Sequence, residues 1–344
     1  MMNKALIAMS GGVDSSVAAY LIQNTGFRCI GATMQLLPNF DPADAQAVAE
    51  KMGMEFHVLD MQTEFANRVM ADFVRCYEEG LTPNPCTVCN RRIKFGALLD
   101  AALALGCEYI ATGHYAQIEQ RNGRFMLKKA ADASKDQSYF LYALTQHQLS
   151  HTLFPLGGLT KEEVRRIAEE QGFVNAHKKD SQDVCFIPDG DYFAFLKKYT
   201  GKDYPAGDFL DMEGNVVGRH CGAAAYTRGQ RKGLGLAMGK PVYVTGKDME
   251  KNTVTVGDNE TLFSTTLLAD DWVFSAFDNL TAPLCCKAKA RSRMTEQPAT
   301  VYPKENGICR VVFDEPQRAL TTGQAVVLYD GELVLGGGTI TEIL

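Results

Sequence analysis

The sequence has no long apolar run. No stretch approaches the ~20 apolar residues of a membrane-spanning helix, and only five apolar residues follow Lys4 before a glycine pair, too few for a secretory signal. Ten cysteines are irregularly spaced, unlike the disulfide framework of a small secreted domain. We therefore expect a cytoplasmic protein without a membrane partner, in which the thiols are catalytic, metal-binding or simply buried.

Three common signatures are also absent. No lysine follows the pair Gly11-Gly12, which excludes the Walker pattern, and there is no G-x-G-x-x-G fingerprint. The single C-x-x-C pair, Cys86 and Cys89, lacks a partner pair at zinc-site spacing. A net charge of −6 argues against indiscriminate nucleic-acid binding but leaves room for a local basic surface. At 344 residues, the chain is long enough for two or three domains.

The first informative feature of the sequence is a glycine turn directly after a strand-like run. Residues 5–9 are apolar, and residues 10–16 read Ser-Gly-Gly-Val-Asp-Ser-Ser. The glycines permit positive φ and close approach of an anion, while the free N–H groups and the dipole of the following helix favour negative charge. The segment resembles the PP-loop of the ATP pyrophosphatase superfamily, whose members adenylate an oxygen and release pyrophosphate.

The first part of the chain alternates strand and helix signals. Strands are predicted over 28–34, 55–59 and 108–112, and helices over 41–53, 64–78 and 92–105. Repeated βα units predict an α/β fold with a doubly wound parallel sheet over 1–143, which binds ligands outside the carboxyl ends of its strands. The glycine turn, Met34 and Gly113-His114 all follow such ends.

The remainder of the chain changes character twice. A capping box at Thr160 and a helical segment over 191–199 predict a small helical central domain, residues 144–206. After Gly207, short β-rich runs alternate with Gly, Asp and Asn, and these runs are 242–245, 253–256, 309–313 and 325–329. They predict a C-terminal β-barrel over 207–344.

Three cysteines are candidates for chemistry. Cys89 lies close to the predicted helix 92–105 and to several basic residues, conditions that lower a thiol pKa below its free value of ~8.5. A single C-x-x-C also fits half of a zinc site or a redox dithiol. Polar neighbours predict a loop around Cys185, although a lone cysteine is more often a buried core residue.

A row of cations marks the C-terminal part. Lys287, Lys289, Arg291 and Arg293 recur at every second position, so that in a strand they would share one face. Such a row is either a phosphate-binding track for RNA or a solvated strand edge that discourages aggregation.

Six motifs then occur in one order: SGGVDSS, NPCTVCNRRIKFG, ATGHYA, KDQSYFL, DSQDVCFI and YTRGQRKGLG. Their order and spacing resemble the MnmA family of bacterial tRNA-specific 2-thiouridylases over almost the whole chain. The resemblance implies a PP-loop domain, a small central tRNA-recognition domain and a tRNA-binding β-barrel. It implies a sulfurtransferase that adenylates the C2 oxygen of the wobble uridine with ATP and Mg²⁺, releases pyrophosphate and AMP, and inserts sulfur. A persulfide donor, either a cysteine desulfurase or a sulfur-relay protein, would be a partner besides tRNA.

The resemblance also assigns residues. It implies that Cys89 is the nucleophile, that Cys185 carries the persulfide, and that the two form a transient disulfide. The implied ATP-binding residues are Ala8, Met9, Ser10, Gly11, Gly12, Val13, Asp14, Ser15, Met34 and Gly113. The implied target-base segment is Asn84, Pro85 and Cys86, and the implied tRNA contacts are His114, Lys135, Asp136, Gln137, Arg291, Ser292 and Gln324.

Two positions depart from the family pattern: Cys86 stands where members commonly have Asp, and Ser292 where the barrel motif often has Tyr. Because cysteine thiolates hold Fe–S clusters, Cys86, Cys89 and Cys185 are also a candidate ligand set for a [4Fe–4S] cluster. Two other functions stay open. One is a PP-loop synthetase of the amidotransferase type, which needs no paired thiols. The other is a nucleotide-gated RNA-binding protein without catalysis.

Overall fold

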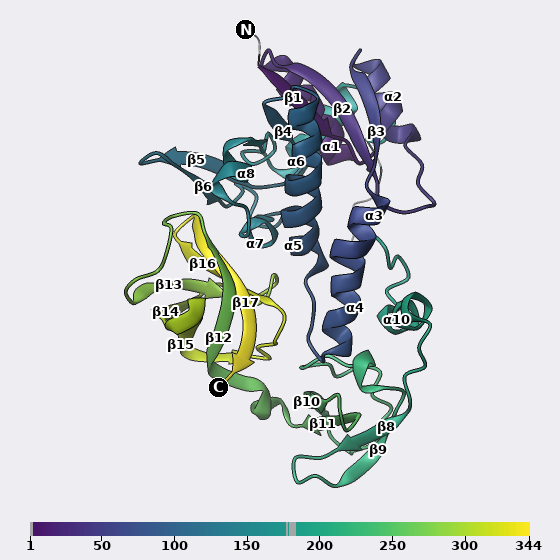
Figure 1. Cartoon of the computed structure of the whole chain (residues 1–344), viewed down its shortest axis with the longest axis vertical. Coiled ribbons are helices and arrows are strands. Elements are labelled where there is room, and N and C mark those ends of the chain that lie inside the picture. Colours follow the sequence, from purple (N-terminus) through teal and green to yellow (C-terminus); the bar gives the residue numbers. More distant parts are fainter. Residues whose placement is uncertain (1–2, 177, 179–183) are drawn as a thin grey trace.

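The computed structural model describes residues 3–176, 178 and 184–344 (Figure 1). Its first unit is a parallel five-stranded sheet in the order β3-β2-β1-β4-β7. The strands are β1 Lys4–Ala8, β2 Arg28–Gln35, β3 Glu55–Asp60, β4 Tyr109–Ala111 and β7 Thr152–Leu153. The order reverses beside β1, because β2 and β3 lie on one side and β4 and β7 on the other. The predicted doubly wound α/β sheet is confirmed.

Helices cover both faces of this sheet. Alternate residues of β1 point to opposite faces: Ala5 and Ile7 belong to one apolar cluster and Leu6 to another. The first cluster includes residues of α1 Val13–Asn24, α2 Ala43–Lys51 and α9 Lys161–Glu170. The second includes residues of two long helices that stand side by side in Figure 1.

Both long helices contain a π-helical stretch. One runs through α3 Gln62–Phe65, a π-helical segment Ala66–Met70 and α4 Ala71–Glu78. The other runs through α5 Pro85–Cys89, a π-helical segment Asn90–Ala97 and α6 Leu98–Ala104. The second helix begins earlier than the predicted 92–105, because Pro85 takes the first helical position, where its missing N–H costs nothing.

The middle of the chain contributes to several units. The capping box at Thr160 is present, and α9 packs on α1, whereas α10 Tyr192–Thr200 packs on α4 through aromatic contacts of Phe73. A four-stranded sheet in the order β10-β11-β8-β9 follows. Its strands are β8 Gly207–Leu210, β9 Val216–His220, β10 Tyr243–Asp248 and β11 Thr253–Gly257.

The C-terminal strands close into a barrel in the order β12-β15-β14-β13-β16-β17, with β17 pairing back onto β12. They are β12 Phe263–Phe274, β13 Leu284–Lys289, β14 Gln297–Pro303, β15 Cys309–Arg318, β16 Ala325–Asp330 and β17 Leu333–Ile343. The runs 242–245 and 253–256 were expected in this barrel, but they lie in the separate four-stranded sheet. Local β signals do not reveal which strands pair. The limits of the three domains stay a prediction.

A hairpin and two short helices complete the fold. The hairpin, β5 Gln117–Arg121 and β6 Arg124–Lys128, extends the barrel sheet beyond β17, where Lys128 pairs with Leu333. The helices are α7 Ser138–Leu141 and α8 Gln146–Ser150.

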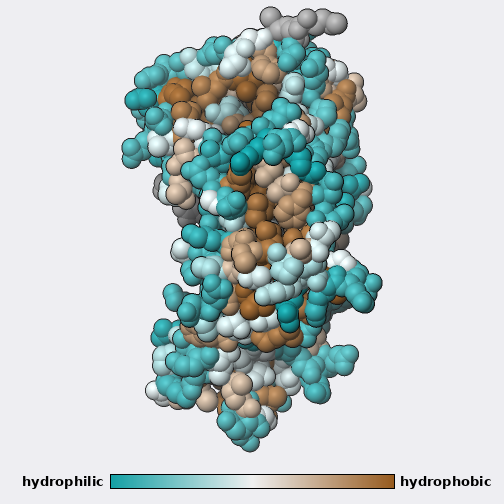
Figure 2. Space-filling view, turned by 90° about the vertical axis from the view of Figure 1, so that its left-hand side faces the viewer, coloured by the Kyte–Doolittle hydropathy of each residue, from teal (hydrophilic) through white to brown (hydrophobic). Residues whose placement is uncertain are grey.

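Figure 2 shows the side of the molecule that lies at the left in Figure 1. Apolar residues gather along the middle of this face, with hydrophilic residues around them. Among the described residues, none of the helices combines the length and apolar character needed to cross a bilayer.

Candidate active site

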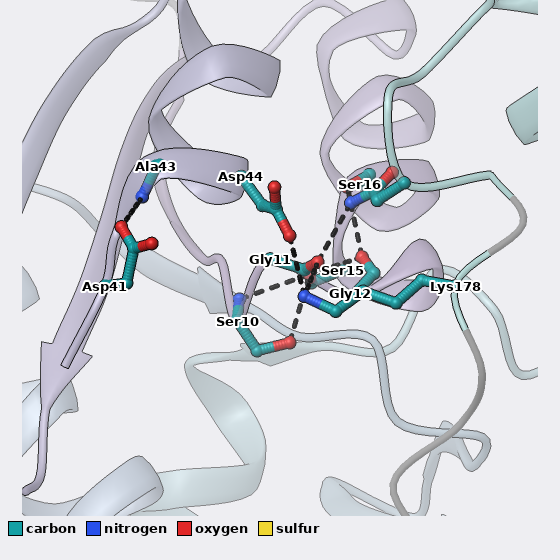
Figure 3. A network of polar contacts seen from close by, with 10 residues as sticks. Ser10, Gly11, Gly12, Ser15, Ser16, Asp41, Ala43, Asp44 and Lys178 are labelled. Atoms are coloured by element: carbon teal, nitrogen blue, oxygen red, sulfur yellow. Dashed lines mark hydrogen bonds and ion pairs between the residues drawn. The ribbon is translucent and has the colours of Figure 1, made fainter. Parts of the chain in front are cut away.

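The glycine turn forms an open loop between β1 and α1 (Figure 3). Gly11 has a φ of 71°, a conformation that favours glycine. The Ser15 hydroxyl donates to the carbonyl oxygen of Gly12 at 2.9 Å and lies 3.2 Å from the backbone nitrogen of Ser10. Among the described residues, no side chain caps α1 at Gly12, which leaves first-turn N–H groups available for an anion.

Residues distant in sequence close around this loop. The side-chain amide of Asn175 donates to the Gly11 carbonyl oxygen at 3.1 Å and to the Ser16 hydroxyl at 2.9 Å. The ammonium of Lys178 contacts the Asp44 carboxylate at 2.6 Å and the Gly11 carbonyl oxygen at 3.4 Å (Figure 3). A cation therefore lies at the glycine turn although none follows the glycines in sequence.

Asp14 is held by two partners. Lys161 donates to both carboxylate oxygens, at 2.8 and 2.9 Å, and the Tyr115 hydroxyl donates at 2.8 Å. Lys161 is 8% exposed, and α9 positions it from the opposite side of the loop. Asp14 thus ties α1 to α9 and to the end of β4.

Gly113 lies against the start of α1. A Cβ atom at Gly113 would stand 2.8 Å from the backbone carbon of Asp14 and from the backbone nitrogen of Ser15. Close packing of β4 on the PP-loop therefore requires glycine here. Met34, half-buried near the end of β2, lies at the same edge of the sheet. The predicted meeting of these strand ends is confirmed, and it coincides with the reversal of strand order, where doubly wound sheets bind ligands.

The cysteine-bearing helix starts at the predicted target-base segment. Asn84 caps it by accepting a hydrogen bond from the backbone nitrogen of Thr87 at 3.4 Å, and Pro85 and Cys86 open the first turn. Cys86 is exposed, whereas Cys89 is only 8% exposed and belongs to the apolar cluster beneath the sheet.

The predicted low pKa of Cys89 is wrong. Burial raises the pKa of this thiol to about 11, and the neighbouring thiols of Cys185 and Cys86 raise it further, while Lys94 opposes the shift. Cys89 lies at the end of α5, beyond the free N–H groups of the first turn, so the surrounding apolar side chains outweigh the helix dipole.

Cys185 is exposed on a loop that its neighbours anchor. Phe186 and Ile187 are buried, and the Phe186 ring contacts the rings of Phe65 and Phe73 edge-on at 5.7 and 5.3 Å. Desolvation and the Cys86 thiol raise the pKa of Cys185. The Cys86 and Cys185 thiols both act on Cys89, and the Cys86 thiol acts on Cys185, so the three thiols lie close enough to interact electrostatically. Residues 180–183 of the DSQDVCFI motif lie outside the described residues.

Several residues expected to contact tRNA bind the protein itself in this structure. Asp136 accepts hydrogen bonds from the backbone of Ala130 and from Ser138, and the Gln137 side chain accepts one from the backbone nitrogen of Tyr115 at 2.9 Å. The Gln324 amide donates to the carbonyl oxygens of Thr82 and Pro83 at 3.1 and 3.0 Å.

The predicted row of four cations is wrong beyond Lys289, where β13 ends. Arg291 turns inward and donates to the backbone oxygen of Arg228 at 3.2 Å and to the hydroxyl of Thr321. Burial lowers the pKa of Arg291. Ser292 follows it outside the strand and is half-buried.

A cleft of about 800 Å³ lies between the two long helices and the barrel. Its lining includes Asn84, Arg68, Arg75, Arg91, Arg92 and Asp271. Arg91 forms an ion pair with Asp271 of the barrel, which spans one side of the cleft. The lining also includes Asp72 and Asp270, so the target-base segment borders a cleft with both arginine and aspartate side chains.

Comparison with known proteins agrees with this architecture. A family model described as the tRNA methyl transferase HUP domain matches residues 3–189, the corresponding PRC-barrel domain matches 193–258, and an aminomethyltransferase beta-barrel domain matches 264–340. The tRNA-specific 2-thiouridylase MnmA of Acetivibrio thermocellus is 47% identical, covering 98% of this chain and 99% of the relative. That of Clostridioides difficile is 46% identical, covering 100% and 99%. The chain belongs to the MnmA family of tRNA-specific 2-thiouridylases.

This membership makes the chain an enzyme, as the motifs predicted, and its PP-loop fold belongs to proteins that use ATP. A solved 4-thiouridine synthetase–RNA complex with bound ATP aligns with 58% of this chain and 50% of its own, at 17% identity and a TM-score of 0.37. That likeness is too distant to carry an argument.

The described residues do not support the [4Fe–4S] hypothesis. They contain no group of three or more His, Cys, Asp or Glu side chains arranged to hold a metal ion, although Cys86, Cys89 and Cys185 are all among them. We therefore derive no step through a cluster.

The sequence alone did not identify four side chains at the site as functional residues: Lys94, Lys161, Asn175 and Lys178. A capping-box helix signalled the position of Lys161, but no sequence pattern pairs it with Asp14. Lys94 is one of the basic residues that were expected to lie near Cys89.

Proposed function

We propose that this protein replaces the C2 oxygen of the wobble uridine of tRNA with sulfur, using ATP for activation and a persulfide on Cys185 as the sulfur carrier. One observation supports this most strongly: the Cys185 thiol, far away in sequence, lies close enough to raise the pKa of Cys89 beside the target-base segment. The names of the relatives, which describe tRNA-specific 2-thiouridylases, agree with it.

Activation would take place at the glycine turn. The C2 oxygen of uridine is a poor leaving group until it is adenylated. The backbone of residues 8–15 would hold the ATP phosphates, and Met34 and Gly113 would border the rest of the nucleotide. When bound, Mg²⁺ would neutralise the departing pyrophosphate. Mg²⁺ commonly binds one or two carboxylates together with phosphate oxygens. Asp14 fits as a protein ligand if its carboxylate oxygens contact both the metal and Lys161.

Sulfur transfer would use both thiols. The terminal sulfur of the Cys185 persulfide attacks C2, and AMP leaves with the former C2 oxygen. The Cys89 thiolate then attacks the inner sulfur of that persulfide, which is Cys185 Sγ. The old S–S bond breaks, its electron pair stays on the sulfur bound to C2, and a Cys89–Cys185 disulfide forms. An external thiol reductant reopens this disulfide by exchange, and a desulfurase or sulfur-relay protein reloads Cys185.

Mass spectrometry of tRNA nucleosides tests this function. Purified protein with tRNA, ATP, Mg²⁺ and a persulfide donor should form 2-thiouridine, and Cys89→Ser or Cys185→Ser should abolish it. Cys76→Ser, at a buried cysteine on α4, is the matched control. Unimpaired thiolation by Cys89→Ser would contradict the two-thiol mechanism. Pyrophosphate release without thiolation would favour a PP-loop synthetase, and tRNA binding without either would favour a non-catalytic RNA-binding protein.

A further inference from the structure

Lys94 lies on the same helix as Cys89, five positions further along. In a regular α-helix of ~3.6 residues per turn, side chains five positions apart point in clearly different directions. Asn90–Ala97 is π-helical, however, and π-helical i→i+5 hydrogen bonding lengthens the turn, so that residues five apart lie closer to one face of the helix. The π-helical segment therefore turns Lys94 toward the side of the helix that bears Cys89.

His114 holds the Lys94 ammonium. The Lys94 Nζ atom lies 3.4 Å from His114 Nε2, and His114 Nδ1 lies 2.8 Å from the Thr112 hydroxyl. Burial and the Lys94 charge keep the pKa of His114 well below its usual range, so the ring is neutral. An ammonium only donates hydrogen bonds, so Nε2 accepts from Lys94 and the ring proton sits on Nδ1.

The position of this ring is well fixed. The His114 ring packs between Phe95 and Phe154, with ring centroids 5.7 and 6.1 Å away. Phe95 directly follows Lys94, so the same helical segment provides the ammonium and one of the two aromatic rings that pack against His114. A neutral, immobile acceptor fixes the ammonium without cancelling its charge.

Lys94 also acts on the thiols. It is the one cation, among the residues that the structure describes, whose charge favours the thiolate form of Cys86, of Cys89 and of Cys185. The other contributions from neighbouring side chains come from the thiols themselves and oppose ionisation.

We propose that Lys94 supplies the positive charge that stabilises the Cys89 thiolate, and that His114 is the positioning residue that holds this charge in place. The inference rests on the proposed two-thiol function, in which Cys89 must attack as a thiolate. On ionisation, the Cys89 proton leaves to solvent and Lys94 keeps its own proton. The result is a thiolate–ammonium pair in a partly desolvated site, where the attraction between the two charges is stronger than in water.

The pH profile of Cys89 alkylation tests the proposal. Full-length protein, without ATP, tRNA or sulfur donor, is treated with iodoacetamide from about pH 7 to pH 10, below the Cys89 midpoint. Tandem mass spectrometry gives the alkylation rate of each cysteine separately, because Cys76, Cys86 and Cys89 share one tryptic peptide. Lys94→Met should slow Cys89 alkylation roughly tenfold at each pH in this range, which corresponds to an upward shift of its midpoint by about one pH unit. Lys94→Arg should restore most of the rate, and His114→Phe should cause a smaller shift in the same direction.

Cys76 is the internal control, because Arg75 and acidic neighbours surround it and Lys94 does not act on it. Its profile should not change. Lys94→Gln serves if Lys94→Met does not fold. An unchanged Cys89 alkylation rate in a folded charge-removing variant would overturn the proposal, whether or not the enzyme thiolates tRNA. Loss of thiolation together with slower Cys89 alkylation would support it, and the nucleoside assay alone decides the overall function.

Discussion

Cys89 and His114 have ordinary sequence neighbours, yet burial changes the ionisation of both side chains. Cys89 is followed by several basic residues, but apolar packing raises its pKa to about 11. His114 is 9% exposed and stays neutral beside a lysine. In both cases the cost of removing a charge from water exceeds the influence of nearby helix dipoles or hydrogen bonds. The chemistry of these residues therefore depends on what packs around them.

We predict that acid destabilises the folded protein through His114. Its pKa is lowered in the folded state, so the unfolded chain binds a proton first as the pH falls. The stability contributed by the neutral ring is complete above about pH 6.5 and is lost below it, by up to about 1.4 kcal/mol per pH unit. Urea unfolding at pH 7.5 and 5.5 measures the loss, which His114→Gln should reduce. His57→Gln, on β3 near the surface, is the control. Equal pH dependence in His114→Gln and the parent protein would show that the ring does not carry this effect.

At the scale of elements, the barrel holds the start of the cysteine-bearing helix. Besides the two hydrogen bonds from Gln324, the backbone nitrogen of Thr82 donates to the Thr322 carbonyl oxygen at 2.9 Å. Gly323 has a φ of 86°, and a Cβ there would lie 2.8 Å from the Thr82 oxygen. The turn before β16 thus fixes the residues that lead into Asn84.

We predict that Gln324→Leu loosens this segment in protein without tRNA. Backbone hydrogen exchange over residues 81–88 should become faster, because two carbonyl oxygens lose their donor, while ATP affinity stays unchanged. Hydrogen exchange measured by mass spectrometry on the free protein checks this. Gln317→Leu, on β15 of the same barrel, is the matched control. If exchange over 81–88 is unchanged and only tRNA affinity falls, Gln324 acts as an RNA contact alone.

At the scale of the whole molecule, contacts between distant segments join the parallel sheet to the barrel. Arg91 pairs with Asp271, and Arg124 of β6 pairs with Asp278 at 2.7 Å. The hairpin β5–β6 leaves the first unit and extends the barrel sheet. On β13 of the barrel, Lys287 is exposed and Lys289 is half-buried. Arg291 instead donates hydrogen bonds to the Arg228 backbone oxygen and the Thr321 hydroxyl.

We predict different effects for these cations. Lys287→Glu and Lys289→Glu should each weaken tRNA binding and reduce the slope of log affinity against log salt by about one unit. Arg291→Ala should instead lower the melting temperature, because it removes contacts to Arg228 and Thr321. Filter binding at several salt concentrations and thermal unfolding check both. Lys251→Glu, in the turn between β10 and β11, is the control for added negative charge. An unchanged slope in both lysine variants would assign Lys287 and Lys289 to a solvated strand edge.

The sequence by itself determined the features that depend on near neighbours. Strand alternation, the capping box at Thr160 and the glycine turn after β1 each follow from a few consecutive residues, because backbone conformation and periodicity are local. The order of the six motifs also indicated the family. The predicted helix 92–105 starts too late, because no local signal shows that Pro85, which is well suited to the first helical position, opens the helix.

Only the tertiary structure decided which distant groups meet. Lys161 reaches Asp14, Gln324 donates to the carbonyl oxygens before Asn84, and Arg291 leaves the row of surface cations for a half-buried position. The same holds for the division of the β runs between a four-stranded sheet and a closed barrel. The physical reason is that burial and hydrogen-bond partners depend on how separate segments pack, and packing removes water from charges and thiols that the sequence alone leaves solvated.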